Sequence, residues 1–193
     1  MAQRKAEQRA HLLETAVRLF GKHGYHATTV PMIVKGAGAS TGSFYFYFRN
    51  KEDVFAAALD GFGARIAATL NEAIDAAGEQ PAAKMRAAVE RLVTFLAENP
   101  DEARILIVET SGLGGRLQQI RRRIVDSHAG AVEAALPLIA PGLDAAVVAR
   151  LWVGGVYETV FHWLELPANR RPPADGVARA AADFNLRGTG VQP

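Results

Sequence analysis

The chain has 193 residues, of which 49% are hydrophobic, and this is enough for one sizeable domain or for a small module beside a larger one. It contains no cysteine, which excludes a disulfide framework and a thiolate metal site. The formal net charge is +2, but residues 1–51 hold eight Lys or Arg against two acidic residues, whereas residues 52–193 hold the other fourteen against eighteen. This imbalance favours a polyanionic partner for the basic head, and the alternative is a solvated face with a chance bias.

Targeting and membrane segments are not expected. The first nine residues are polar and charged, with no apolar run behind them, so they do not resemble a secretory signal. The longest purely apolar runs, such as residues 105–108, are far shorter than the roughly 18–20 residues that a membrane span needs. We therefore expect a soluble, cytoplasmic protein without a membrane partner.

Helices are predicted along most of the chain, because alanine is abundant and Gly and Pro gather between periodic segments. Thr29, Ser40 and Asn50 stand where their side chains can cap the second, third and fourth helices. The expected fold class is all-α, with about nine helices at residues 4–22, 30–37, 40–47, 51–77, 81–98, 101–110, 116–140, 143–166 and 174–186.

Five consecutive aromatic residues, from Phe44 to Phe48, end the third of these helices. Their Phe-Tyr alternation also fits a β-strand, but two helix caps flank the run and no second strand candidate lies nearby. On a helix, Phe44 and Phe48 share one face, and we expect both in the core. Tyr45 and Tyr47 must then point largely elsewhere, where their hydroxyl groups can find partners.

Small residues form the first turn of the same helix. Thr41 and Ser43, on either side of Gly42, offer hydroxyl groups that can bond to base edges or to phosphates. Reading residues at the N-terminal end are typical of a recognition helix that enters the major groove of DNA. Together with the helix at 30–37 and the Gly-containing turn, the segment predicts a helix-turn-helix, and Lys51 adds a cation for phosphate at the next helix start.

The stretch from Thr28 to Val54 resembles the DNA-binding signature of the tetracycline-repressor (TetR) family, whose pattern is roughly TTV-x-x-IA-x-x-AGVS-x-G-x-x-Y-x-YF-x-x-KE-x-L. Leu19-Phe20 and Gly24-Tyr25 match the family as well. The chain departs from the pattern at Val34 and Ala39, and at Pro31, where a polar phosphate contact is often found.

The resemblance implies a role for each matching residue. Ser40 is expected to cap the recognition helix, with Thr41, Gly42 and Ser43 facing base edges. The expected contacts to the DNA backbone come from four residues: Thr29, Tyr45, Tyr47 and Lys51. Two of these assignments have a purely structural alternative, because Ser40 can act only as a cap and Tyr47 can pack within the module.

The resemblance also implies two domains, a helix-turn-helix DNA-binding domain at 1–55 and a ligand-binding and dimerisation domain at 56–193. In the second domain, polar side chains interrupt apolar helix faces, as a small-molecule site would require. The candidate ligand residues are Glu109, His128, Trp152, Tyr157 and Phe161. The alternative for each polar residue is an internal hydrogen bond to a neighbour.

The helix at 143–166 is apolar over most of its circumference and must bury more than one face. The helix at 174–186 adds an apolar stripe that includes Val177 and Phe184. Two such helices meeting their symmetry mates make a four-helix bundle, so we expect a homodimer through these two helices. A central helix in a monomer is the alternative.

The expected function is a ligand-responsive transcriptional regulator that binds a palindromic operator on double-stranded DNA and is released by a small apolar or amphipathic inducer. Repression, the commoner outcome in the family, is expected over activation; a DNA-binding activator or architectural protein without an inducer is the alternative. An enzyme is not expected, because the glycines at 36–40 and 112–115 follow no strand and lack the Lys-Ser/Thr ending of a phosphate loop. No catalytic set, cofactor site or metal-ligand spacing is visible.

Overall fold

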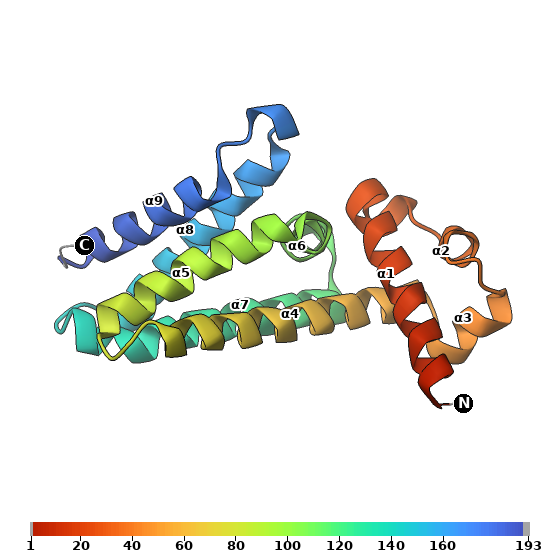
Figure 1. Ribbon diagram of the computed structural model, residues 1–193, viewed down its shortest axis with the longest axis horizontal. Coiled ribbons are helices and arrows are strands. Elements are labelled where there is room, and N and C mark those ends of the chain that lie inside the picture. Colours follow the sequence, from red (N-terminus) through yellow and green to blue (C-terminus); the bar gives the residue numbers. More distant parts are fainter. Residues whose placement is uncertain (1, 191–193) are drawn as a thin grey trace. The chain divides into compact units, whose positions relative to one another are not determined.

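The computed structural model describes residues 2–190, and over this range the chain is helical, with short connections and no strand (Figure 1). This confirms the all-α prediction. The α-helices are α1 (Ala2–Ala27), α2 (Val30–Gly36), α3 (Thr41–Tyr47), α4 (Lys51–Ala76), α5 (Pro81–Glu98), α6 (Pro100–Ile107), α7 (Gly115–Ile139), α8 (Ala145–Glu165) and α9 (Ala174–Gly188). Two 3-10 helices, η1 (Glu109–Gly112) and η2 (Ala168–Arg170), complete the described elements.

The helices form two compact units that are not continuous in sequence. The first holds the chain up to Phe62 together with Pro100–Arg121. The second holds Gly63–Asn99 together with the chain from Arg122 onward. The helices α4 and α7 therefore contribute residues to both units, and the unit that contains α1 to α3 also contains α6. The domain boundaries at 1–55 and 56–193 stay a prediction.

The core of the first unit is built from helix faces with period 3.6. Leu12, Ala16 and Phe20 follow one another at four-residue spacing along α1, and all three are fully buried. Ile33 from α2 and Phe44 from α3 are also fully buried. These apolar side chains hold the three N-terminal helices together and so fix the orientation of α3.

A close helix crossing joins α1 to α6 in the first unit. At Gly21 the two backbones are so near that a Cβ atom would lie 2.7 Å from the Cβ and 2.8 Å from the Cα of Asp101. Three residues later the helical geometry of α1 is interrupted at Gly24, and the next amide, on Tyr25, donates to the Glu109 carboxylate at 2.7 Å. The end of α1 is therefore held by residues more than seventy positions away.

Replacing Gly21 with alanine is expected to lower the free energy of unfolding by about 1–3 kcal/mol, because the added methyl group overlaps the α6 backbone. This destabilisation outweighs the helix preference of alanine over glycine, which is about 1 kcal/mol. Chemical denaturation of the two proteins measures the difference. Gly61 in α4 is the matched control, since no atom lies within 4 Å of its would-be Cβ. Alanine at position 61 is expected to be neutral or stabilising, and equal gains at both positions would contradict the packing argument.

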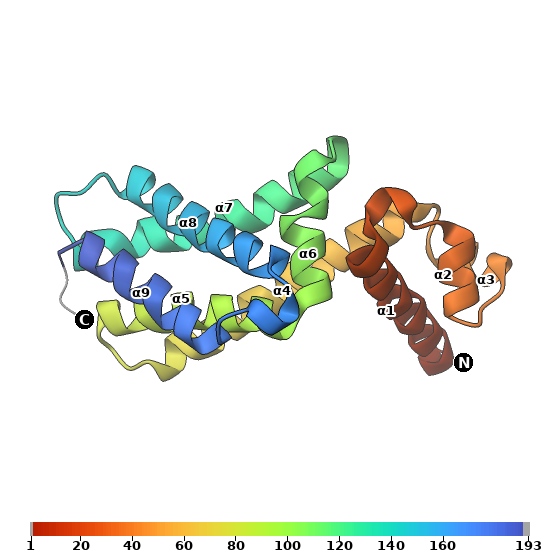
Figure 2. The ribbon, with the colours of Figure 1, turned by 90° about the horizontal axis from the view of Figure 1, so that it is seen from above.

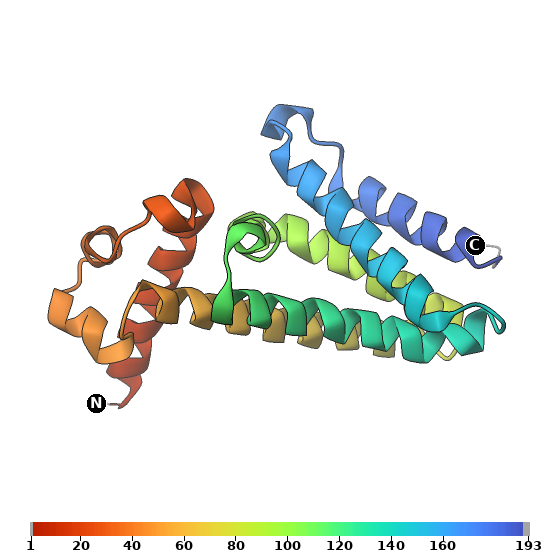
Figure 3. The same ribbon diagram turned by 180° about the vertical axis from the view of Figure 1, so that it is seen from behind.

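In the second unit, α9 lies along α5, as two views show (Figures 1 and 2). The buried face of α9 includes Ala178, Ala182 and Leu186. The two alanine side chains are small, so the helices can approach closely. The helix α7 lies alongside α4 in this unit (Figure 3), where a Cβ on Gly63 would meet the Ile124 side chain at 2.8 Å. No helix within residues 2–190 is sufficiently long and apolar to cross a membrane.

Candidate nucleic-acid interface and ligand site

Both helices of the helix-turn-helix begin with the predicted side-chain caps. The Oγ1 of Thr29 accepts from the amide of Met32 at 3.4 Å, and the Oγ of Ser40 accepts from the amide of Ser43 at 3.1 Å. Between α2 and α3 the chain turns through Gly38, whose φ of 56° is readily adopted only by glycine. These local interactions confirm the predicted capping roles and set the angle at which α3 leaves the turn.

The five aromatic residues divide between core and surface. Phe44 is fully buried and Phe48 is 3% exposed, which confirms the prediction for both. Tyr45 is 54% exposed and Phe46 is 66% exposed, so these two rings project from the recognition helix into solvent. Tyr47 is half-buried, and its hydroxyl donates to the Oε1 of Gln8 at 3.4 Å. The run therefore supplies an anchor on one side of α3 and exposed ring surface on the other.

The N-terminal turn of α3 presents the small residues unevenly. Thr41 and Gly42 are exposed. Ser43 is half-buried, and its Oγ is covered and makes no hydrogen bond with the residues that the structure describes. In this conformation Thr41 and the backbone at Gly42 are the groups most open to a base edge, whereas Ser43 must rotate its side chain to reach one.

Lys51 opens α4 and faces the end of α1. Its Nζ donates to the carbonyl oxygens of Tyr25 at 2.7 Å and His26 at 3.4 Å, and it lies 4.2 Å from the centre of the Tyr25 ring. Partial burial lowers the pKa of Lys51 from its ordinary value. The ammonium therefore satisfies carbonyl groups at the end of α1, a structural role that sequence reasoning did not assign to it.

Replacing Lys51 with alanine is expected to destabilise the first unit by about 1–3 kcal/mol, because the variant lacks the hydrogen bonds from a charged donor to two carbonyl groups. Thermal or chemical unfolding in the absence of DNA measures this effect. Lys35, which is exposed on α2, is the matched control, and its replacement by alanine is expected to leave stability nearly unchanged. Equal stability of the two variants would show that Lys51 has no structural role.

A cluster of opposite charges closes the N-terminal end of α4. The amide of Asp53 donates to the side chain of Asn50, which caps the helix. The carboxylate of Asp53 forms ion pairs with Arg49 at 2.8 Å and with Arg116, from the first turn of α7, at 2.7 Å. Hydrogen bonds from Arg49 and Arg116 lower the pKa of Asp53 to about 2. These two guanidinium groups are thus engaged with a carboxylate beside the helix-turn-helix, and they tie the starts of α4 and α7 together.

The candidate ligand residues are not all found together. Glu109 belongs to the first unit, where its carboxylate accepts a hydrogen bond from the Tyr25 amide. In the second unit, the Tyr157 hydroxyl lies 3.0 Å from the Nδ1 of His128, and both residues are buried. Burial lowers the pKa of His128 to about 4. Trp152 is buried and Phe161 is half-buried. The structure therefore brings together one polar pair, His128 and Tyr157, among apolar surroundings.

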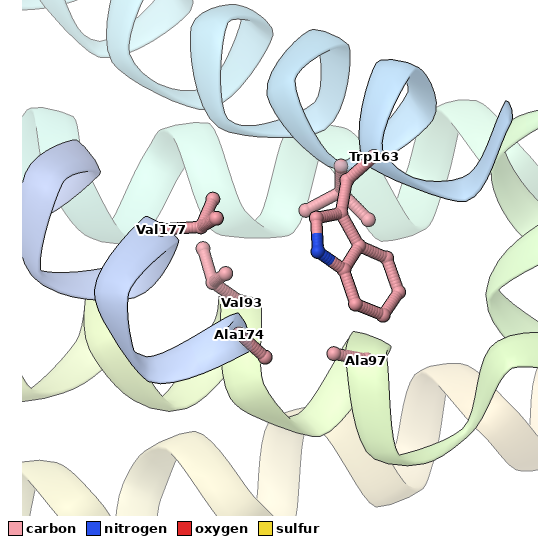
Figure 4. A pocket seen from close by; sticks show the side chains of 6 residues that line it. Val93, Ala97, Trp163, Ala174 and Val177 are labelled. Carbon is pink, nitrogen blue, oxygen red and sulfur yellow. The ribbon is translucent and has the colours of Figure 1, made fainter. Parts of the chain in front are cut away.

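A shallow hollow lies among α5, α8 and α9 (Figure 4). In the figure the ring of Trp163 extends from α8 toward Ala97 on α5. The indole Nε1 donates to the Pro172 carbonyl at 2.9 Å, and the Arg171 guanidinium lies 4.7 Å from the ring centre. The hollow is lined by Val93, Ala97, Val160, Trp163, Ala174 and Val177. None of the candidate ligand residues lines it, and no polar motif in the sequence marks it.

Comparison of the sequence with known proteins identifies the N-terminal segment. The profile of the bacterial regulatory proteins of the tetR family matches residues 12–58. The uncharacterized HTH-type transcriptional regulator YdgC of Bacillus subtilis is 33% identical over 108 residues, which is 54% of this chain and 55% of that relative, so the match spans about half of its length. The fatty acid metabolism regulator protein of Bacillus subtilis is 25% identical over 161 residues, covering 79% of this chain and 81% of the relative.

Solved structures share the fold over nearly the whole chain. The fatty acid degradation regulator FadR from Bacillus halodurans superposes with a TM-score of 0.85 at 20% identity and covers 96% of this chain and 97% of its own. FadR from Bacillus subtilis in complex with stearoyl-CoA superposes with a TM-score of 0.76 at 22% identity, and the match covers 93% of this chain and 98% of that one. AibR in complex with isovaleryl coenzyme A and operator DNA superposes with a TM-score of 0.77 at 17% identity, and the match covers 92% of this chain and 97% of that one. Residues 12–58 thus carry the profile of the tetR family of bacterial regulatory proteins, and the helices of the whole chain are arranged as in these solved regulators.

Proposed function

We propose that the chain is a ligand-responsive transcriptional repressor that binds a palindromic operator as a homodimer and releases it when a small apolar or amphipathic inducer binds. The observation that carries the proposal is the exposed N-terminal turn of α3, which a capped and well-packed helix-turn-helix presents to solvent. Thr41, Gly42 and Tyr45 are exposed on this helix, while Phe44 and Phe48 anchor it from behind. This is the arrangement that reading of base edges in the major groove requires.

The proposed contacts divide by chemistry. Thr41, Gly42 and, after a side-chain rotation, Ser43 meet base edges, with Ser40 as the cap that fixes their turn. Thr29, Tyr45, Tyr47 and Lys51 contact the backbone. Lys51 has a further N–H group beyond the two that bond to Tyr25 and His26, and this group can donate to a phosphate.

The dimer is proposed to form through α8 and α9. Large apolar side chains on these helices remain exposed in the single chain: Val147 by 54%, Leu151 by 68% and Phe184 by 78%. Gly154 and Gly155 are exposed on α8 and would let a partner backbone approach closely. Such a face is normally covered by another protein surface, and a second copy provides the twofold symmetry that a palindromic operator demands.

Replacing Phe184 with glutamate is expected to weaken dimerisation by at least about tenfold, because a carboxylate would be buried in an apolar interface. Sedimentation velocity over a range of protein concentrations measures the dissociation constant. Leu138, which is 72% exposed but lies on α7, is the control, and its replacement by glutamate is expected to leave the dimer intact. A wild-type chain that stays monomeric at high concentration would rule out the proposed dimer.

The inducer is proposed to be an acyl-CoA or a molecule of similar amphipathic character. Support comes from the fold neighbours whose structures hold stearoyl-CoA and isovaleryl coenzyme A. The hollow in the second unit encloses no cavity of the roughly 300–1,000 Å³ that typical ligand sites have. An acyl chain would therefore have to part the helices of the second unit, and this movement is the proposed signal.

The signal is proposed to travel through α4 and α7, which contribute residues to both units. The ion pair between Asp53 and Arg116 joins the first turns of these two helices, and we propose that it couples their movement. An inducer that binds the parted helices better than the closed ones would shift the population toward a state whose two recognition helices no longer match half-sites about 34 Å apart.

Selection of tight-binding duplexes from a random pool tests the proposal, followed by titration of the bound complex with acyl-CoAs of several chain lengths. The expected result is an enriched inverted repeat that Thr41→Ala and Tyr45→Ala variants bind at least about tenfold more weakly, since these side chains supply base and phosphate contacts. Weak binding without enrichment, abolished as salt rises, would overturn the operator proposal. An enriched repeat that no acyl-CoA releases would favour a regulator without this inducer.

A further inference from the structure

The first turns of α1 carry a basic strip that lies over the C-terminal end of the recognition helix. We define the strip as Lys5, Gln8 and Arg9, which share one helix face because they are three and four residues apart. We propose that this strip is a second DNA-contact surface, which binds phosphates beside the half-site read by α3, and that Phe46 positions Lys5 for this contact. The inference rests on the proposed function, because it adds contacts to the same protein–DNA complex.

Each residue of the strip meets an aromatic residue of the run in turn. The Nζ of Lys5 lies 5.1 Å from the centre of the Phe46 ring, and the Cζ of Arg9 lies 5.2 Å from the centre of the Phe48 ring. Between them, the Tyr47 hydroxyl donates to Gln8 at 3.4 Å. Two cation–π contacts and one hydrogen bond therefore fix the strip against the end of α3.

The charges of the strip are available to an anion. Lys5 and Arg9 are exposed, and neither forms an ion pair with any residue in the described part of the chain. Two other cations nearby differ in this respect, since Arg49 and Arg116 both bond to the Asp53 carboxylate.

The neighbouring acidic residue of α1 does not neutralise the strip. Glu7 lies two positions from both Lys5 and Arg9, so it points about 200° away from each around the helix. The strip thus keeps an unbalanced positive charge on the side of α1 that faces the end of α3, and such a surface attracts a polyanion.

The position of Phe46 is otherwise difficult to explain. A phenyl ring that is 66% exposed on a short helix contributes little to the core, and the neighbouring Phe44 and Phe48 already provide the anchor. Its contact with Lys5 restricts a long, flexible side chain before DNA binds. Restricting the free protein in this way reduces the conformational entropy that must be given up when the ammonium meets a phosphate.

The strip lies away from the reading residues. Tyr47 is six residues beyond Thr41, which places it about 9 Å further along the helix axis. A phosphate contact from this end of α3 is separate from the base edges that Thr41 is proposed to read, and it would add affinity and salt dependence without sequence preference.

The test measures operator affinity at several salt concentrations for the wild type and for the Lys5→Gln, Arg9→Gln and double variants. The expected result is a smaller slope of log affinity against log salt, by about 0.9 for each phosphate that the variant no longer neutralises, with unchanged preference among operator sequences. Trimming the flanking base pairs of the duplex is expected to reduce wild-type affinity and to leave the double variant unaffected. Arg122→Gln, a change at an exposed residue of α7, is the control for removal of a charge elsewhere.

Phe46 is tested by a double-mutant cycle with Lys5. Phe46→Leu is expected to weaken operator binding several-fold in the wild type and to have no effect in the Lys5→Gln background, whereas Phe46→Tyr keeps the ring and restores binding. Equal weakening in both backgrounds would overturn the positioning role. If the Lys5 and Arg9 variants keep the wild-type slope of log affinity against log salt, the second DNA-contact surface is overturned while the proposed function stands. A wild type that prefers no operator over a scrambled duplex would overturn the proposed function and this inference together.

Discussion

Replacing Phe44 with alanine is expected to lower the free energy of unfolding of the first unit by about 3–5 kcal/mol, the usual result of removing a fully buried phenyl ring. The ring is the main apolar anchor of α3, a helix of only seven residues that has little stability of its own. Circular dichroism during chemical denaturation measures this destabilisation. Operator binding is expected to disappear with it, because an unanchored α3 cannot hold its reading residues in place.

The same helix supplies the control. Phe46 has the same side chain two residues later but is 66% exposed, so its replacement by alanine is expected to cost less than about 1 kcal/mol of stability. Because both variants remove the same phenyl ring, a difference in their stability reports the burial of the ring and not its chemical type. Similar destabilisation at positions 44 and 46 would contradict the assignment of one ring to the core and the other to the surface.

Stability is also expected to depend on His128 below neutral pH. Its folded-state pKa of about 4 lies below the unfolded value of 6.5, because burial disfavours the charged imidazolium. Above pH 6.5 the histidine is neutral in both states and its contribution to stability is complete. As the pH falls from 6.5 toward 4, the unfolded chain binds the proton first, and stability decreases progressively, by on the order of 3 kcal/mol in total.

Urea denaturation between pH 7 and pH 4.5 measures this dependence, and the His128→Gln variant is expected to flatten it over the same range. The difference between the two proteins removes the contribution of carboxylates, which both share. His162 is the control, since it is exposed on α8 and its replacement by glutamine is expected to leave the slope unchanged. A wild type and a His128→Gln variant with parallel curves would show that the imidazole is not buried in its neutral form.

Local signals in the sequence predicted the local structure well. The helix at 81–98 has the predicted bounds, and the caps at Thr29, Ser40 and Asn50 are confirmed, because a cap depends on residues three positions apart. The core positions of Phe44 and Phe48 follow from helical spacing and are likewise confirmed. Within the aromatic run, however, spacing alone did not show that Phe46 is left exposed.

Partners that are distant in sequence could not be foreseen. Glu109 interrupts an apolar segment as a ligand residue would, but its carboxylate receives the amide of Tyr25, eighty-four positions earlier. The sequence predicts a phosphate contact for Lys51, whereas its hydrogen bonds to the end of α1 depend on how two helices meet. The placement of α6 beside α1 is of the same kind, since only the tertiary fold brings Asp101 against Gly21. The hollow beside Trp163 arises from three helices and has no signature in any one of them.

The discontinuity of the first unit has a consequence for synthesis on the ribosome. When Phe62 has emerged, the helices of the DNA-binding module exist, but α6, which packs on Gly21, has not yet been translated. About 40 further residues are needed, which at 5–20 residues per second takes roughly 2–8 s. During this interval the nascent chain presents the uncovered side of α1 to chaperones and proteases. A messenger truncated before codon 100 is therefore expected to yield a fragment that is degraded rather than one that competes for the operator.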